Sequence, residues 1–259
     1  HILATYGYPL SFGISFALCA AFQVVSYTCL LLNREPARAP QAAPLGAAAY
    51  WRSLPGMLRG HPNFVRYLVG TGLLTFGTMG TALYIVYARR AFGVSDAVAA
   101  NLTMVALIGQ SLCAPLFGRL ADRRGNKWLL QLGGLIHAAA IATVALAPNE
   151  LWLYPAFLLV NAGVQASSIS GMGITMEFSA PDEIPTFTAI AGTISGIPTL
   201  LAPLLGGTLV DLGGFGLLFA CALVFALAGF VFIRFAVREP RHDPRGSVLA
   251  ARSSSTEGE

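Results

Sequence analysis

The stretch Gly118–Lys127 constrains this sequence more than any other. It reads Gly-Arg-Leu-Ala-Asp-Arg-Arg-Gly-Asn-Lys, which puts four positive charges and one acid between two long apolar segments. A charge cluster this dense is too costly to place in hydrocarbon, so it marks a short turn in water between two membrane spans. Because so short a turn leaves little chain between the spans, we expect the two flanking helices to lie side by side.

The two flanking segments belong to a series of candidate membrane spans. A spanning helix needs about 20 largely apolar residues. Seven stretches qualify, at residues 8–32, 66–88, 97–118, 128–147, 151–176, 186–210 and 215–236. Only 11% of the residues are charged, whereas soluble domains carry about 25%. The sequence therefore predicts an all-α integral membrane protein with these transmembrane helices.

The positive residues gather on one side of the predicted spans. Fourteen of the 16 Lys and Arg residues follow spans one, three and seven, and only Arg89 and Arg90 fall on the opposite side. The positive-inside rule then places the odd-numbered junctions and the C-terminus in the cytoplasm. The net charge of +4 does not indicate a nucleic-acid partner, because these residues form no continuous basic face. We expect a multi-pass protein of the bacterial cytoplasmic (inner) membrane.

The charged stretch also carries a fixed spacing, Gly-x-x-x-Asp-Arg-x-Gly-x-Lys, formed by Gly118, Asp122, Arg123, Gly125 and Lys127. This spacing resembles the signature loop of the major facilitator superfamily. The resemblance implies a major-facilitator-type fold and a secondary transporter. It also implies that Asp122 and Arg123 latch the two halves of the transporter when it is open to the outside. The glycines would allow close helix approach and a turn with positive φ.

Glu177 ends span five on the same predicted side as the charged stretch. It is a candidate partner for Arg119 or Arg123 in the latch. The alternative is a charge cluster that sets the topology and has no gating role. Asp122 is expected at the start of a helical segment or near a neighbouring one, where it would meet the positive helix end.

A weak internal repeat suggests how the spans are grouped. Arg34-Glu35-Pro36 follows span one, Arg238-Glu239-Pro240 follows span seven, and the spans between them give a period of six. Such a period is expected of a transporter built from two parallel halves. Residues 1–32 would then be the last helix of a first half and 33–65 a cytoplasmic connection with an amphipathic helix. Residues 66–241 would be the second six-helix half, and 242–259 a disordered cytoplasmic tail. The chain would thus be part of a longer protein, with the first half as its partner.

Polar side chains inside the spans are candidates for a substrate cavity. Thr71, Thr75 and Thr78 share one face of span two, and span five carries Asn161 and Gln165. Gln110 in span three is a weaker candidate. Uncompensated amides are costly in lipid, so these groups should face the bundle or a water-filled cavity. Interhelical hydrogen bonding is the alternative explanation. His137, in the middle of span four, is expected to be neutral and bonded to a neighbouring helix.

The remaining patterns narrow the function class. We find no protease, hydrolase or phosphate-loop motif and no metal-ligand spacing, so we expect neither an enzyme nor a cofactor. No Asp or Glu lies in the centre of a span, which would put any proton-carrying carboxylate in the other half. The expected function is transport of a small solute by alternating access, with this part alone inactive. One alternative is a proton-coupled multidrug exporter, and another is a non-transporting membrane scaffold or receptor.

Overall fold

The computed structural model describes residues 10–33, 55–179 and 183–239. The chain divides into two compact units, His1–Leu45 and Gly46–Glu259. The predicted tail 242–259 and most of the predicted connection 33–65 lie outside the described residues. The domain boundaries drawn from the sequence therefore stay predictions.

The first unit contains a single described helix, α2 (Leu10–Leu31). Its 22 residues extend about 33 Å at 1.5 Å per residue, which matches the roughly 30 Å of a bilayer's hydrocarbon core. Large apolar side chains such as Phe16, Phe22 and Leu31 are exposed along it. An apolar surface of this kind fits a helix surrounded by lipid or by other helices.

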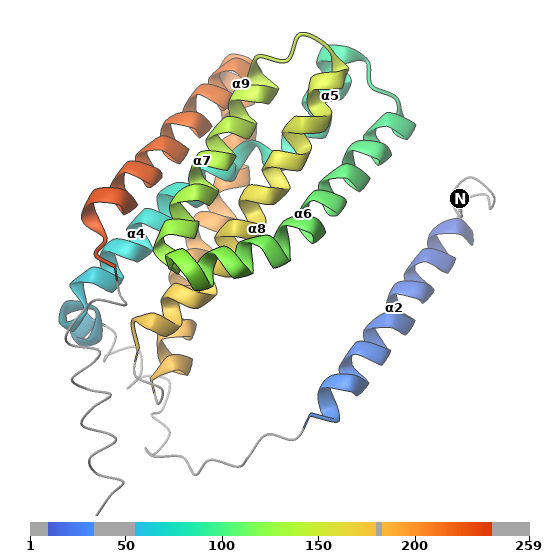
Figure 1. Cartoon of the computed structure of the whole chain (residues 1–259). Coiled ribbons are helices and arrows are strands. Elements are labelled where there is room, and N and C mark those ends of the chain that lie inside the picture. The colour runs from blue at the N-terminus through green and yellow to red at the C-terminus, as the bar shows by residue number, and fades with distance from the viewer. Residues whose placement is uncertain (1–9, 34–54, 180–182, 240–259) are drawn as a thin grey trace, which may run out of the picture. The chain divides into compact units, whose positions relative to one another are not determined.

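The second unit is a bundle of helices (Figure 1). In chain order its elements are α4 (Pro62–Gly77), the 3₁₀-helix η1 (Thr78–Leu83), α5 (Tyr84–Phe92), α6 (Asp96–Arg124), α7 (Asn126–Ala145), the 3₁₀-helix η2 (Glu150–Trp152), α8 (Leu153–Glu177) and α9 (Ile184–Ala236). Over the described residues of both units, six helices are long and apolar enough to cross a membrane. The predicted all-α membrane fold is confirmed.

The last helix, α9, contains two predicted spans. Its 53 residues would extend about 80 Å, more than twice the thickness of the hydrocarbon core. At Gly214 the backbone leaves helical geometry, with φ 72° and ψ −173°. Only glycine adopts such a positive φ readily, so the residue separates α9 into two helical segments. The predicted junction between spans six and seven is found at this glycine.

The span that starts with α4 is interrupted near its middle by η1. Gly77 and Gly80 flank the start of η1 and lower the preference for a regular α-helix. Thr78 donates its hydroxyl back to the carbonyl of Thr75 at 2.7 Å, which also competes with regular helix hydrogen bonding. A Cβ on Gly77 would lie 3.0 Å from the Cα of Ala226 in α9. The interruption is therefore packed tightly against α9.

The two helices that flank the charged stretch do not lie side by side, and that expectation is wrong. Both α6 and α7 pack mainly along α8, while they contact each other only sparsely. Figure 1 shows them diverging from their shared end. Small residues direct this packing: a Cβ on Gly109 of α6 would lie 3.1 Å from Leu158, and one on Gly133 of α7 would lie 3.1 Å from Ala166. The fit of each helix to α8 outweighs the shortness of the connection.

An aromatic cluster holds the ends of three helices next to the charged stretch. The rings of Phe64 in α4 and Phe187 in α9 lie 4.8 Å apart between centroids. Phe178, which follows α8, lies 5.5 Å from Phe64 and 5.6 Å from Tyr67. Pairs at these distances add to the stability gained from burial alone. The cluster fixes the end of the bundle at which the candidate site lies.

Candidate functional site at the α6–α7 junction

The charged stretch is mostly helical and is not the ten-residue turn that the sequence suggested. α6 continues through Arg124, and α7 begins at Asn126. Gly125 alone breaks the helix, with φ 93° and ψ 153°. This conformation is strained for any residue with a Cβ, so the expected positive φ is confirmed at Gly125. Four of the charged side chains are thus presented on the last turns of α6, and Lys127 lies in the first turn of α7.

The other signature residues lie close to this break. Asp122 lies in the last turn of α6 and does not start a helix, which leaves the other expected position, near the start of a neighbouring helix, because α7 begins four residues after it. Asp122 and Arg123 are exposed at the surface of the described structure. A Cβ on Gly118 would meet nothing within 4 Å, so the close helix approach expected there is not found among the described residues.

Glu177 is brought to the junction by a hydrogen bond that the sequence did not suggest. The side-chain amide of Asn126 donates to Oε1 of Glu177 at 2.8 Å, across 51 residues of sequence. A Cβ on Gly173 would lie 2.4 Å from Nδ2 of Asn126, so the amide occupies the space that this glycine leaves open. The bond joins the start of α7 to the end of α8. Pairing of Glu177 with Arg119 or Arg123 stays a prediction.

Two further contacts shape the charge around the junction. The guanidinium carbon of Arg124 lies 4.7 Å from the ring centroid of Trp128, in a cation–π contact that places this arginine along α7. Lys127 is half-buried and interacts electrostatically with Glu239, which follows α9. Asn126 and Glu239 were both missed by the sequence analysis. Asn126 occupies an unspecified position in the spacing pattern, and Glu239 lies 112 residues further along the chain than Lys127.

The predicted cavity threonines are satisfied within their own helix. Thr71 donates to the carbonyl of Tyr67 at 3.1 Å, and Thr75 donates to the carbonyl of Thr71 at 2.9 Å. Thr78 does the same to Thr75. All three threonines are half-buried. Their hydroxyl oxygens keep acceptor capacity, but their protons are already donated along the helix.

Two of the predicted amides meet. The side chain of Gln110 in α6 donates to Oε1 of Gln165 in α8 at 3.1 Å. Asn161, one turn before Gln165, donates to the carbonyl of Phe157 at 3.3 Å within α8. In the described structure no hydrogen bond joins these amides to the threonines of α4 and η1. The amides and the threonines are therefore two separate polar groups within the bundle.

His137 lies in the α7–α8 interface. Its side chain is only 5% exposed, and a Cβ on Gly163 of α8 would lie 3.2 Å from its Nδ1. Its Nε2 has no hydrogen-bond partner among the described residues. The hydrogen bond that we expected between His137 and a neighbouring helix is therefore not made by this nitrogen.

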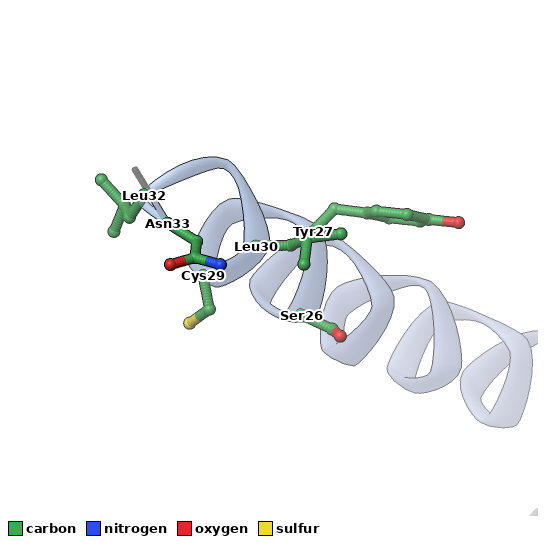
Figure 2. Close-up of a pocket in the computed structure, with 6 residues that line it drawn as sticks. All are labelled: Ser26, Tyr27, Cys29, Leu30, Leu32 and Asn33. Carbon is green, nitrogen blue, oxygen red and sulfur yellow. The ribbon is translucent and has the colours of Figure 1, made fainter. Parts of the chain in front are cut away.

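A shallow hollow on α2 is not a candidate site. Figure 2 shows the six residues around it, which all come from the last turns of this helix and the two residues after it: Ser26, Tyr27, Cys29, Leu30, Leu32 and Asn33. All six are exposed. Side chains of one helix do not enclose a ligand on several sides, as binding pockets do.

The fold and the junction define the class of protein. The chain is an α-helical multi-pass membrane protein, and its charged segment with the fixed spacing joins α6 to α7. The family model of the Major Facilitator Superfamily matches residues 67–256, which is more than half of the chain. The chain therefore belongs to the major facilitator superfamily, a family of membrane transporters.

Individual relatives carry transporter names. The human protein named solute carrier family 67 member A1 is 32% identical over 134 residues, which are 50% of this chain and 31% of that protein. The multi-drug resistance efflux pump PmrA homolog of Lactococcus lactis subsp. lactis is 28% identical over 149 residues, or 56% of this chain and 36% of the pump. The multidrug resistance protein MdtG of Dickeya zeae is 30% identical over 140 residues, or 52% of this chain and 33% of that protein. The chain matches only about a third of the length of each of these relatives.

Proposed function

We propose that this chain moves a small solute across a membrane by alternating access, as the second six-helix half of a secondary transporter. In this proposal a first half, whose last helix is α2, completes the protein. The two halves rock about a site near the membrane midplane. The membrane is the bacterial cytoplasmic membrane, with the α6–α7 junction and the C-terminus in the cytoplasm.

The observation that carries the proposal is the construction of the α6–α7 junction. Its helix end presents Asp122 and Arg123 at the surface, and the Asn126–Glu177 hydrogen bond ties it to α8. A rigid charged helix end is suited to gripping an opposing surface and releasing it in a two-state motion. In our proposal Asp122 and Arg123 engage the first half while the cytoplasmic side is closed.

The amide pair Gln110–Gln165, together with Asn161, gives the proposed cavity neutral polar character. Neutral amides offer both donors and acceptors and carry no charge, so they suit an uncharged or weakly polar solute. A specific finding favours a second candidate function, proton-coupled export of drugs, because relatives named as multidrug pumps match this part of the chain. In that case the proton-carrying carboxylate lies in the first half.

The test is solute flux in liposomes that contain the assembled transporter with both halves. Asp122→Asn removes the charge of the latch and keeps the shape of the side chain. We expect slower flux with unchanged membrane insertion, because the cytoplasmic-closed state loses an ionic contact. Glu150→Gln, at the opposite end of the bundle in η2, is the control.

Each result bears on a different part of the proposal. Flux at the wild-type rate in Asp122→Asn would remove the latch role. Strong export of hydrophobic cations would favour the multidrug exporter. Binding of a partner protein without any flux would favour the scaffold or receptor instead.

A further inference from the structure

The end of α9 is fastened to the start of α4 by a single carboxamide. The backbone N–H of Arg238 donates to Oδ1 of Asn63 at 2.8 Å, and Nδ2 of Asn63 donates to the carbonyl of Arg238 at 3.1 Å. One side chain thus satisfies both backbone groups of a residue 175 positions away. Val237, directly before Arg238, is only 2% exposed. The chain that leaves α9 is therefore held in place by the burial of Val237 and by the two hydrogen bonds of Arg238.

These two hydrogen bonds place the next residue, Glu239, beside the α6–α7 junction. A Cβ on Gly125 would lie 3.1 Å from Oε1 of Glu239 and 3.6 Å from its Cδ. The carboxylate therefore lies against the one residue that breaks the helix between α6 and α7. Because Gly125 has φ 93° as well, a side chain there would strain the backbone and would require the Glu239 carboxylate to shift.

The charges around Glu239 give it an electrostatic role at the same place. Lys127 is attracted by Glu239 and repelled by Arg234 of α9. Glu239 lies among the positive residues at the ends of α6, α7 and α9. Its negative charge reduces the repulsion between them. Lys127 is only half-exposed, so its interaction with Glu239 is less screened than that of a surface pair.

We propose that Glu239 is a positioning residue of the α6–α7 junction. We call the two hydrogen bonds between Asn63 and Arg238 the clasp. The clasp holds Glu239, and the carboxylate of Glu239 fixes Gly125 and Lys127. The last turn of α6 is then held in the orientation that presents Asp122 and Arg123. This role rests on the proposed function of the junction as a latch, and it adds the first and last helices of the six-helix unit to that latch.

The role has a mechanical consequence. A change at the junction is transmitted to the start of α4 through Glu239, Arg238 and Asn63, because each link is a direct contact. Latch engagement by Asp122 is thereby coupled to the span that contains η1. The coupling requires the charge of Glu239 and the carboxamide of Asn63.

Limited proteolysis of the purified transporter in lipid nanodiscs tests the role without measuring transport. Trypsin cuts after Arg123 and Arg124 only when the junction opens locally. In Glu239→Gln we expect cleavage there to be about fivefold faster, as for the loss of one partly screened ion pair. Cleavage after Arg89 and Arg90, which are exposed at the end of α5, is an internal reference and stays unchanged.

Three further variants separate positioning from a general loss of stability. Asn63→Ala is expected to speed cleavage at the junction as Glu239→Gln does, because the clasp is lost. Glu239→Asp keeps the charge and is expected to restore most of the protection. Glu183→Gln removes an exposed acid at the start of α9 and leaves the cleavage rate unchanged.

Equal cleavage rates in the wild type and Glu239→Gln would overturn the positioning role, whatever the flux measurements give. Acceleration at both the junction and the Arg89 and Arg90 reference would also overturn it, because a general loss of stability would then explain the result. Absence of solute flux in the wild-type transporter would contradict the proposed function instead. The two failures are therefore distinguishable.

Discussion

Gly206 of α9 lies directly against the backbone carbonyl of Met79 in η1. A Cβ on Gly206 would be only 2.5 Å from that oxygen and 3.2 Å from the carbonyl carbon. Met79 is 1% exposed, so neither group has room to move away. The 3₁₀-helix η1, which interrupts the first span of the bundle, thus packs against α9, a helix that also contains Pro198 and Pro203. At this point the backbones of the two irregular helices are in direct contact.

This contact predicts that Gly206→Ala destabilises the protein. The added methyl group must displace backbone and not a flexible side chain, at a cost of about 1–3 kcal/mol, as for overpacking in other cores. The higher helix propensity of alanine offsets about 1 kcal/mol of this at most. Thermal unfolding of the purified protein in detergent measures the difference.

The neighbouring residue supplies the control. A Cβ on Gly207 would meet nothing within 4 Å. Gly207→Ala should therefore leave the unfolding temperature unchanged or raise it slightly. If both variants unfold at the same temperature, the contact with Met79 does not restrict position 206.

Sequence reasoning succeeded where a local pattern determines the structure. The length of the apolar stretches was enough to locate the helices of the bundle, and Gly125 has the positive φ that we expected. The break at Gly214 also followed from composition, because a glycine-rich junction interrupts two apolar runs. Each of these features depends on residues within one or two helical turns.

It failed where the structure depends on which helices meet. The divergence of α6 from α7 is decided by small residues that fit α8, and no pattern within either helix reveals that choice. Asn126 and Glu239 were missed for the same reason, since their partners lie 51 and 114 residues away, at Glu177 and Gly125. The clasp between Asn63 and Arg238 is more distant still.

The hydrogen bond between Asn126 and Glu177 predicts a measurable coupling. Removing either partner, with Asn126→Ala or Glu177→Ala, costs stability, and removing the second partner after the first costs less. We expect a coupling free energy of about 1 kcal/mol, as for a hydrogen bond to a charged group that is only half-buried. Urea or thermal unfolding of the four proteins in the cycle measures it. Additive effects would show that the contact contributes nothing.

Gly173 should be required for the same hydrogen bond. A methyl group there would overlap the carboxamide of Asn126, whose Nδ2, Cγ and Oδ1 atoms all lie within 2.5 Å of the Cβ position. Gly173→Ala is therefore expected to cost about 1–2 kcal/mol and to remove the coupling between Asn126 and Glu177. Gly171→Ala is the matched control, because its Cβ would meet only the hydroxyl of Tyr67, at an ordinary 3.6 Å. A Gly173→Ala protein that keeps the coupling would contradict this account.

The amide pair decides between substrate contact and simple helix packing. If Gln110 and Gln165 contact the solute, Gln110→Ala and Gln165→Ala should each raise the KM for flux about three- to tenfold, the value of one hydrogen bond. The double variant should then be less than multiplicative, because the two side chains share a hydrogen bond. Thr143→Ala is the control, since that exposed hydroxyl bonds only to the carbonyl of Ala139 within α7. A lower unfolding temperature with an unchanged KM in both single variants would instead assign the pair to packing between α6 and α8.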